Sequence, residues 1–522
     1  MHPLLCAAPG ALPNKNMRTI RHHVDLQART QPDAPYLIAP ETGRVMTYSQ
    51  LKSDSEQLGR YLLGQGLVQG DKVALMLHNG YQTGRLLIGV MYAGFMVAPL
   101  NLLSQAEQLS YVLDHSDTRL VFTAAEFIER LTPALRQIPR DIKVVVIDHD
   151  APSIFDNASL NAGTCFAVTE NDDALLMYTS GTTGKPKGVV LSQRSVAAGG
   201  EFTSGAHELT PADRVMCALP LYHINGQIVT AVAPIVHGGS VVMPHRFSVS
   251  NYWDTVVQFK CTWINVVPTI IAYLLNAPDP RERGLDISSI KFCRSASAPL
   301  PPELHRAFEA KFGISIIETF GMTETNAPCF TNPYDRLKRK IGSPGRAYGN
   351  SARIIDPITG ESLPAGAVGE IMVRGDNVMK GYYKDPETTA KTLEPDGWMH
   401  TGDLGYMDRD DFVFVTGRIK ELIIKGGENI APREIDEALL KHPAVLEAAA
   451  VGIPDVHYGQ EIMACVVLKP GECCSLDELY AFSQQQLGKY KMPKLIKLVR
   501  TLPKGPSGKV QRLKLLEAAT GL

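Results

Sequence analysis

The chain has 522 residues, of which 44% are hydrophobic and 20% are charged, and its formal net charge is −2 at pH 7. This length predicts several domains, and the composition excludes a disordered chain or a coiled coil. The near-neutral charge gives no reason to expect nucleic acid or an anionic membrane as a partner, and no stretch approaches the roughly 18 apolar residues that a spanning helix needs.

The N-terminal residues and the cysteines give information on the cellular compartment of the protein. Residues 1–16 contain prolines and lack the positively charged leader of a signal peptide, so a disordered extension is expected, with Met17 as an alternative start. The nine cysteines form no CxxC pairs. They fit neither a zinc site nor a disulfide framework, so we expect a cytoplasmic protein.

Strand-like apolar runs alternate with helical stretches from about residue 20 to residue 420, which predicts α/β architecture with parallel sheets. Residues 72–78 are a predicted strand and residues 83–94 the helix that follows it. The further predicted strands are residues 120–122, 144–147, 240–243 and 262–267.

The pattern changes twice toward the C-terminus. From residue 352, short strands separated by turn sequences predict a small β-rich lobe. After residue 417, helices at 433–441 and 475–487 accompany strands at 448–451 and 461–468. We therefore predict a large N-terminal domain over 17–417, built of two α/β sheet subdomains and the lobe, and a small mobile α+β domain over 418–522.

A loop rich in glycine, hydroxyl and lysine residues reads YTSGTTGKPKG over residues 178–188. Glycines let the backbone approach an anion, and hydroxyls and lysines bind its oxygens. A flexible surface loop is the alternative, but apolar runs on both sides indicate a tight connection between buried strands. Pro186 follows Lys185, so the loop is not a Walker A motif. The candidate phosphate ligands are Thr179, Ser180, Gly181, Thr182, Thr183, Gly184, Lys185 and Lys187.

Four further motifs follow: ETFGMTE over 318–324, TGD over 401–403, GRIKE over 417–421 and PKGPSGK over 503–509. In this order the five motifs resemble those of the adenylate-forming superfamily, which includes acyl-CoA synthetases, the adenylation domains of peptide synthetases and firefly luciferase. The resemblance spans nearly the whole chain. It implies that ATP and a small carboxylic acid form an acyl-adenylate and pyrophosphate, and that a thiol then takes the acyl group, with ATP, Mg²⁺ and CoA required.

The resemblance also implies roles for residues near the nucleotide. Phe320 would pack on adenine, Thr323 would contact the α-phosphate as a catalytic residue, and Glu324 would hold Mg²⁺, which prefers oxygen ligands. A polar turn after a strand is the alternative for this motif. The family more often has glycine or alanine at the position of Ser297. The remaining candidates around the adenine are Ser297, Ala298, Pro299, Glu318, Thr319 and Gly321.

Four charged residues match later motifs of the family. Asp403 would accept the ribose hydroxyls, and Arg418 would make a second ribose or phosphate contact. Lys420 matches the hinge of the C-terminal domain, and Lys509 matches the catalytic lysine that bridges the carboxylate and the α-phosphate. Taken alone, a turn aspartate and solvated lysines are the ordinary interpretations.

The acceptor and the acid are less closely defined. Lys425, Gly426 and Gly427 match a turn that faces the pantetheine tunnel of CoA ligases, although a simple β-turn explains the same residues. No carrier domain follows Leu522, which favours free CoA. The motifs alone leave luciferase-like oxidation open, and they say nothing about the oligomeric state.

His223 matches the family's aromatic gate between ATP and acid. The polar residues expected around it predict a short polar acid, such as sulfoacetate or oxalate, because buried amides need polar partners; residues 244–247 could add a cation. A medium-chain fatty or aryl acid–CoA ligase, and a stand-alone adenylation protein that loads a carrier, remain alternatives. The predicted acid-pocket residues are His223, Asn225, Gln227, Asn265, Ser297 and Gly321.

Overall fold

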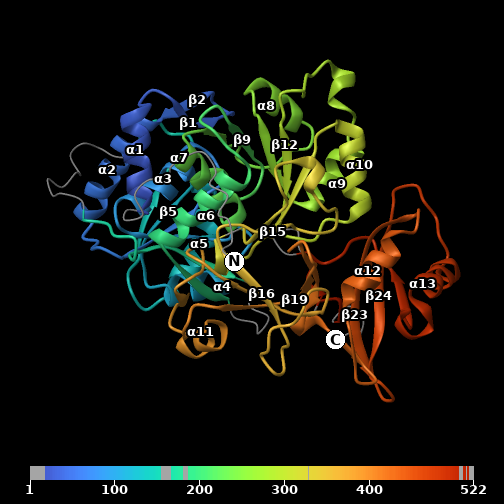
Figure 1. The fold of residues 1–522 in the computed structure, drawn as a ribbon. Helices are drawn as coiled ribbons and strands as arrows, with labels where there is room; N and C mark the ends of the chain where they lie inside the picture. Colours follow the sequence, from blue (N-terminus) through green and yellow to red (C-terminus); the bar gives the residue numbers. More distant parts are fainter. Residues whose placement is uncertain are drawn as a thin grey trace, which may run out of the picture.

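Two large sheets form the N-terminal part of the chain, and two smaller sheets follow toward the C-terminus (Figure 1). The computed structural model describes residues 18–153, 166–179, 186–326, 328–504, 510–512 and 514–516. The predicted disordered extension, residues 1–16, lies outside these residues. The α/β class, with a large N-terminal and a small C-terminal domain, is confirmed.

The seven-stranded sheet is parallel at its centre and ends in an antiparallel hairpin. Its central strands are apolar and buried, as expected when helices cover both faces. In spatial order the strands are β18 (Gly381–Tyr382), β8 (Lys187–Ser192), β7 (Asp173–Thr179), β4 (Met96–Pro99), β3 (Lys72–Met76), β5 (Thr118–Thr123) and β6 (Lys143–Val146). The helices between its early strands are α3 (Tyr81–Tyr92), α4 (Ala106–His115), η1 (Ala125–Phe127) and α5 (Ile128–Leu135).

The nine-stranded sheet has a parallel core with antiparallel strands at both edges. Its order is β15 (Arg346–Ala347), β14 (Phe330–Thr331), β13 (Ile316–Phe320), β12 (Phe292–Ser295), β11 (Trp263–Val266), β9 (Arg214–Cys217), β10 (Ser240–Val242), β1 (Pro35–Ala39) and β2 (Arg44–Thr47). The carboxyl ends of β12 and β13 lead directly to Ser297 and Gly321, so two predicted motifs meet at one edge of the sheet.

Helices fill the space between and around the large sheets. Every residue of α3 is buried, because this helix packs on strands of both sheets. One helical segment, η3, is a π-helix, a rare geometry that often marks functional sites. The other elements are α1 (Ile20–Thr30), α2 (Tyr48–Gly64), α6 (Gln193–Ala206), η3 (Asn225–Val232), α7 (Ala233–His237), α8 (Tyr252–Gln258), α9 (Pro268–Asn276), η4 (Pro280–Arg283), α10 (Pro302–Phe312), η5 (Thr323–Thr325) and η6 (Arg336–Lys338).

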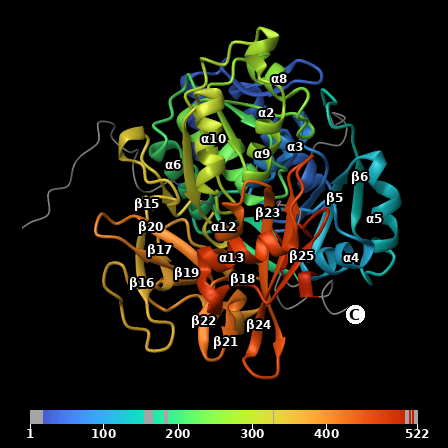
Figure 2. The ribbon, with the colours of Figure 1, turned by 90° about the vertical axis from the view of Figure 1, so that its right-hand side faces the viewer.

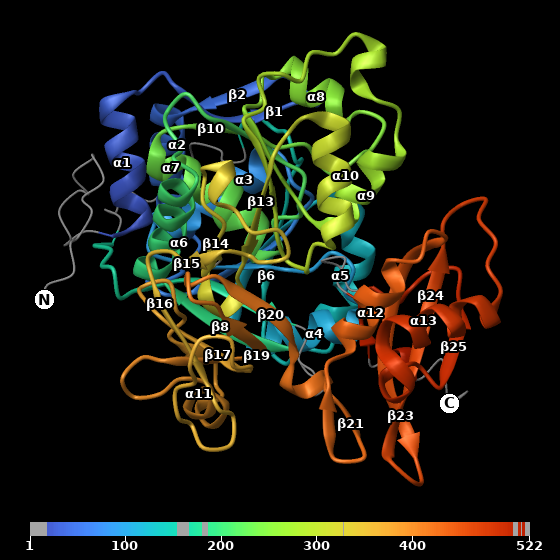
Figure 3. The same ribbon diagram turned by 45° about the vertical axis from the view of Figure 1, so that its right-hand side comes forward.

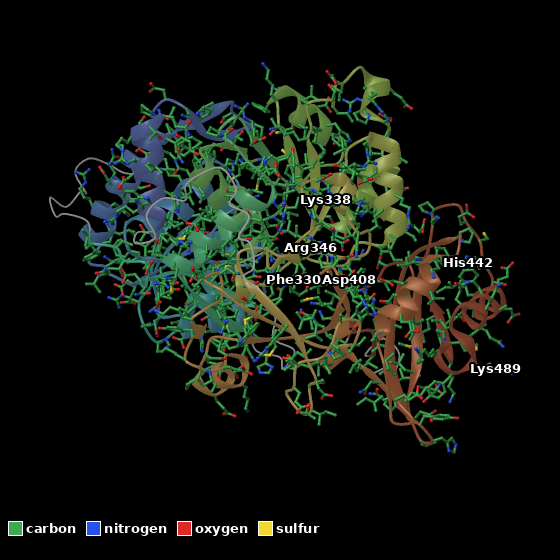
Figure 4. The ribbon with its side chains drawn as sticks, viewed as in Figure 1. Phe330, Lys338, Arg346, Asp408, His442 and Lys489 are labelled. Atoms are coloured by element: carbon green, nitrogen blue, oxygen red, sulfur yellow. The ribbon has the colours of Figure 1, made fainter. Side chains whose placement is uncertain are left out.

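The predicted β-rich lobe is a four-stranded antiparallel sheet with its own apolar cluster. Phe330, on the nine-stranded sheet, belongs to this cluster. Figure 4 shows Phe330, Arg346 and Asp408 close to the junction between the nine-stranded sheet and the lobe. The lobe consists of β16 (Ser351–Ile355), β17 (Gly369–Arg374), α11 (Pro386–Thr392), β19 (Met399–Met407) and β20 (Val413–Arg418).

The C-terminal part is an α+β unit in which two apolar clusters sandwich a five-stranded sheet. Arg433 on its first helix donates a hydrogen bond to the Val415 carbonyl of the lobe. Figures 2 and 3 show that the hairpin β21–β22 points away from the large sheets. The elements are η7 (Ile419–Glu421), β21 (Ile423–Lys425), β22 (Glu428–Ile430), α12 (Pro432–Leu440), β23 (Val445–Asp455), β24 (Gly459–Leu468), α13 (Leu476–Lys491) and β25 (Leu495–Leu498).

The predicted elements are confirmed with shifts of a few residues at their ends. The helix expected at 83–94 is α3, and the strands expected at 72–78 and 262–267 are β3 and β11. The helix expected at 433–441 is α12, and the strand expected at 448–451 is the middle of the longer β23. None of the helices in the described part of the chain is long and apolar enough to cross a membrane.

Candidate functional site

The two strands that flank the glycine-rich loop form a buried hairpin. β7 ends at Thr179 and β8 begins at Lys187, and these two residues are register partners. The Lys187 ammonium lies 5.0 Å from the centre of the Tyr382 ring, which favours a cation. The candidates Ser180, Gly181, Thr182, Thr183, Gly184 and Lys185 lie outside the described residues.

Tyr382 joins the loop to the motif at 318–324. Its hydroxyl donates a hydrogen bond of 3.0 Å to Oε1 of Glu324, whose backbone carbonyl accepts from the Met379 N–H at 2.8 Å. Glu324 is buried on the short helix η5, and this burial raises the pKa of its carboxyl. Thr323, next to it, is half-buried. Such a carboxylate gains most from a nearby cation, because desolvation penalises its charge.

Asp403 and Arg418 face each other on β19 and β20. Nε of Arg418 donates to Oδ1 of Asp403 at 2.8 Å, and the Asp403 side chain is almost fully buried. Burial opposes the charge of Arg418, but the Asp403 and Glu421 carboxylates outweigh it and raise the pKa of the guanidinium. Burial raises the pKa of the Glu324 carboxyl, Arg418 lowers it, and the negative charge of Asp403 raises it further. The motifs around residues 324, 403 and 418 therefore lie together.

Glu318 connects the strand β13 to the turn that carries Ser297, Ala298 and Pro299. Its Oε1 accepts from the Leu300 N–H at 3.3 Å, whereas Oε2 is buried with no hydrogen-bond partner among the described residues. Burial raises the pKa of this carboxyl.

The residues after Glu318 extend the strand rather than forming a turn. β13 continues through Thr319 to Phe320, whose ring lies 5.7 Å from that of Phe330. Gly321 follows directly and is half-buried. The short segment after Gly321 holds Thr323 and Glu324, so strand β13 delivers the whole motif to the carboxyl edge of the sheet.

A cavity of about 310 Å³ opens beside this edge. Leucine, isoleucine, valine, phenylalanine, alanine and proline side chains form part of its wall, and the rest is polar or basic. His245 also pairs with Asp150, at 3.0 Å, whereas Arg246 is an exposed cation. The polar and basic lining residues are His78, Asn79, Tyr222, His223, Asn225, His245, Arg246, Thr269 and Ser297.

The predicted acid-pocket residues divide into two groups. His223, Asn225 and Ser297 line the cavity. Asn265, Gln227 and Gly321 do not belong to its lining among the described residues, and the first two are fully buried. Asn265 lies behind the wall, where its Nδ2 donates to Oδ1 of Asn225 at 3.2 Å.

The residues predicted to face CoA lie apart from those around Glu324. Lys425 is buried inside the C-terminal unit, 2.9 Å from a Glu461 carboxylate oxygen and 2.8 Å from the Tyr490 carbonyl. Gly426 and Gly427 form the tip of the β21–β22 hairpin with φ of +57° and +88°, which glycine adopts without strain. Lys420 is exposed on η7, directly after β20. Lys509 lies outside the described residues.

Sequence reasoning missed two residues of this region. Tyr382 stands in a β-rich stretch where aromatic residues are common, so nothing marked it. Arg294 lies on β12, a buried parallel strand in which a charged residue is unusual. That anomaly could have identified it, since its neighbours in the strand are apolar or small.

Comparison with known proteins agrees with this geometry. Residues 24–383 match the AMP-binding enzyme family, and residues 434–509 match the AMP-binding enzyme C-terminal domain. The chain is 54% identical to a sulfoacetate–CoA ligase of Cupriavidus necator, over 96% of this chain and 98% of the relative. It is 34% identical to an oxalate–CoA ligase of Arabidopsis thaliana, over 90% and 92% of the two chains.

Solved structures are similar over the same length. ATP-bound MatB from Rhodopseudomonas palustris superimposes with a TM-score of 0.87 at 31% identity, covering 95% of this chain and 98% of that one. The matches thus extend over nearly the whole chain. The chain belongs to the AMP-binding enzyme family.

Proposed function

We propose that the protein is an AMP-forming acid–CoA ligase whose substrate is a short carboxylic acid with a second anionic group, with sulfoacetate as the first choice. The acid would attack the α-phosphate of ATP to give an acyl-adenylate and pyrophosphate. The CoA thiol would then attack the acyl carbon, releasing AMP. Identity of 54% to a sulfoacetate–CoA ligase over nearly both whole chains supports this choice.

The observation that carries the proposal is the basic and polar end of the 310 Å³ cavity. Its volume lies at the lower limit of typical ligand pockets, which span roughly 300–1,000 Å³. Arg246, His245 and His78 can meet a sulfonate or a second carboxylate, whereas an aliphatic chain offers these groups neither charge nor a hydrogen-bond acceptor. A hydrogen bond to a charged group contributes about 1.5–3 kcal/mol.

Positioning and charge neutralisation would supply most of the catalysis, since nucleotidyl transfer needs little covalent help from the protein. In this proposal Asp403, held by Arg418, accepts the ribose hydroxyls, and Thr323 donates to the α-phosphate. Lys509 would bridge the carboxylate and the α-phosphate. The glycine-rich loop from Thr179 to Lys187 would hold the pyrophosphate that leaves.

Magnesium fits the donor set at Glu324. This buried carboxylate keeps one oxygen beyond its hydrogen bond from Tyr382, and Mg²⁺ is commonly held by one or two carboxylates together with substrate phosphates. When bound, the ion would neutralise phosphate charge. Tyr382 would then orient the carboxylate, and its ring would lie against Lys187.

A panel of acids tests the proposal, with AMP release measured in the presence and absence of CoA. Sulfoacetate, oxalate and malonate should support CoA-dependent turnover better than octanoate or benzoate. Higher kcat/KM for octanoate or benzoate would refute the choice of substrate. Turnover with a pantetheinylated carrier protein but not with CoA would refute the choice of acceptor.

A further inference from the structure

Arg294 is a buried cation that the catalytic scheme does not use. It is only 1% exposed, and in the described part of the chain no aspartate or glutamate forms an ion pair with it. Burial lowers the pKa of its guanidinium to about 9, which still leaves the group charged at pH 7. An uncompensated buried charge is costly, so its retention calls for a reason other than stability.

The hydrogen bonds of Arg294 fix the direction of two amides. Nη1 donates to Oδ1 of Asn225 at 2.7 Å and to Oδ1 of Asn265 at 2.9 Å. Because a guanidinium has donors only, both amide oxygens must face it. The Asn225 Nδ2 therefore points the other way, where it donates to Oγ of Ser297 at 3.0 Å.

Arg294, Asn225 and Ser297 thus form a chain of hydrogen bonds, here called the relay. Ser297 is its last member and lines the cavity. Its oxygen accepts from Asn225, so its hydroxyl hydrogen is left to donate toward the space that Asn225 and Ser297 both line. The wall thus offers donors to a ligand and has a positive charge directly behind it. Such a surface favours an anion over a neutral group.

The backbone at both cavity residues is unusual. Ser297 has φ of +71°, a left-handed conformation that serine rarely adopts and that commonly marks ligand sites. Asn225 begins the π-helix η3, whose wider turns also occur mostly at functional sites. These two observations, independent of the hydrogen bonds, place the relay at a ligand-binding wall.

We propose that Arg294 is a positioning residue for acid specificity: through Asn225 and Ser297 it holds the wall as a donor surface and supplies the positive charge that selects an acid with a second anionic group. The inference rests on the proposed function, because it assumes that the cavity holds the acid. Arg294 itself touches neither the acid nor ATP in this scheme.

The decisive variant is Asn265→Asp. Asn265 is fully buried and does not line the cavity among the described residues, so the substitution leaves the lining intact. It places a carboxylate 2.9 Å from Nη1 of Arg294, where it cancels the charge and keeps that hydrogen bond, while it removes the Nδ2 donor to Oδ1 of Asn225. Arg294→Met removes charge and donor together. The matched control is Arg339→Met, since Arg339 is a half-buried arginine bonded to the carbonyls of Pro333, Ile316 and Tyr334 away from the cavity.

The assay compares sulfoacetate with 3,3-dimethylbutanoate, an acid of similar tetrahedral shape without the second charge. The ratio of their kcat/KM values should fall on the order of 10- to 100-fold in Asn265→Asp and Arg294→Met, the usual range for losing a hydrogen bond to a charged group. The change should appear in the KM for sulfoacetate, with the KM for ATP unchanged. Arg339→Met should keep the ratio, and melting temperatures report on folding.

The outcomes separate the two proposals. A wild-type enzyme that prefers 3,3-dimethylbutanoate overturns the proposed function and this inference with it. A wild-type preference for sulfoacetate that persists in Asn265→Asp overturns only the role of Arg294. Equal loss of both acids in Asn265→Asp means a merely structural role and also overturns it. If Arg294→Met does not fold, Asn265→Asp alone decides, because its carboxylate compensates the buried charge.

Discussion

Replacing Ser297 with glycine or with alanine separates the two properties of this residue. Both substitutions remove the hydroxyl that accepts from Asn225 at 3.0 Å. Only glycine also relieves the backbone, because φ of +71° lies in the left-handed region that other residues avoid. The pair therefore compares the same chemical loss with and without the backbone strain.

The magnitudes follow from these two terms. A left-handed backbone conformation costs a residue other than glycine about 1–2 kcal/mol. Glycine avoids this cost, but its greater chain entropy in the unfolded state offsets about 0.5–1 kcal/mol of the gain. Ser297→Gly should therefore be more stable than Ser297→Ala by about 0.5–1 kcal/mol. An unfolding entropy of about 2.1 cal/mol/K per residue over roughly 400 residues converts this to about 1 °C in Tm. Loss of a donor to a charged group should lower kcat/KM for sulfoacetate roughly 10- to 100-fold in both variants.

Differential scanning fluorimetry without ligands measures the first effect, and CoA-dependent AMP release with sulfoacetate measures the second. A lower Tm for Ser297→Gly than for Ser297→Ala would refute the strain argument. Wild-type kcat/KM in either variant would refute the role of the hydroxyl as a donor to the acid.

Three further predictions concern other parts of the chain. Lys509→Ala should lower adenylation by about 100- to 1,000-fold yet spare thioester formation from a supplied acyl-adenylate; equal loss of both half-reactions in single-turnover assays would contradict the proposed role. Lys425→Ala should lower the free energy of unfolding of the C-terminal unit by about 3–5 kcal/mol, measured by urea unfolding, because it leaves Glu461 charged and buried. The double variant Glu461→Gln/Lys425→Met removes both charges, and its urea transition should be unchanged if the ion pair makes no net contribution to stability. Burial lowers the pKa of His207 from its ordinary 6.5 to about 3, so the unfolded state binds its proton first and the free energy of unfolding falls as the pH drops from about 6.5 toward 3. Between pH 6.5 and 4.5, the free energy of unfolding of His207→Asn should therefore fall by about 2–3 kcal/mol less than that of the wild type. Identical slopes of this free energy against pH in the two proteins would contradict a neutral buried histidine.

The sequence was sufficient for the fold because its strands and helices are strongly patterned. The apolar run at residues 73–77 and the fully buried strand at 263–266 are typical of a doubly covered parallel sheet. The candidate residues Glu324, Asp403 and Arg418 were found from short motifs, and the structure brings them together.

What escaped prediction depends on contacts between distant segments. Arg294 is separated by 69 residues from Asn225, and Tyr382 by 58 from Glu324, so no local pattern links them. Asn265 was expected in the pocket wall but lies behind it, because strand pairing decides which polar residue faces the cavity. The boundary at residues 418–420, the hinge and the CoA-facing turn stay predictions.

The depth of Asn265 has a consequence for how acid preference can change over time. A substitution there alters the charge beneath the wall while the contour of the cavity stays the same. Part of the charge near the cavity thus depends on a position that does not shape the cavity.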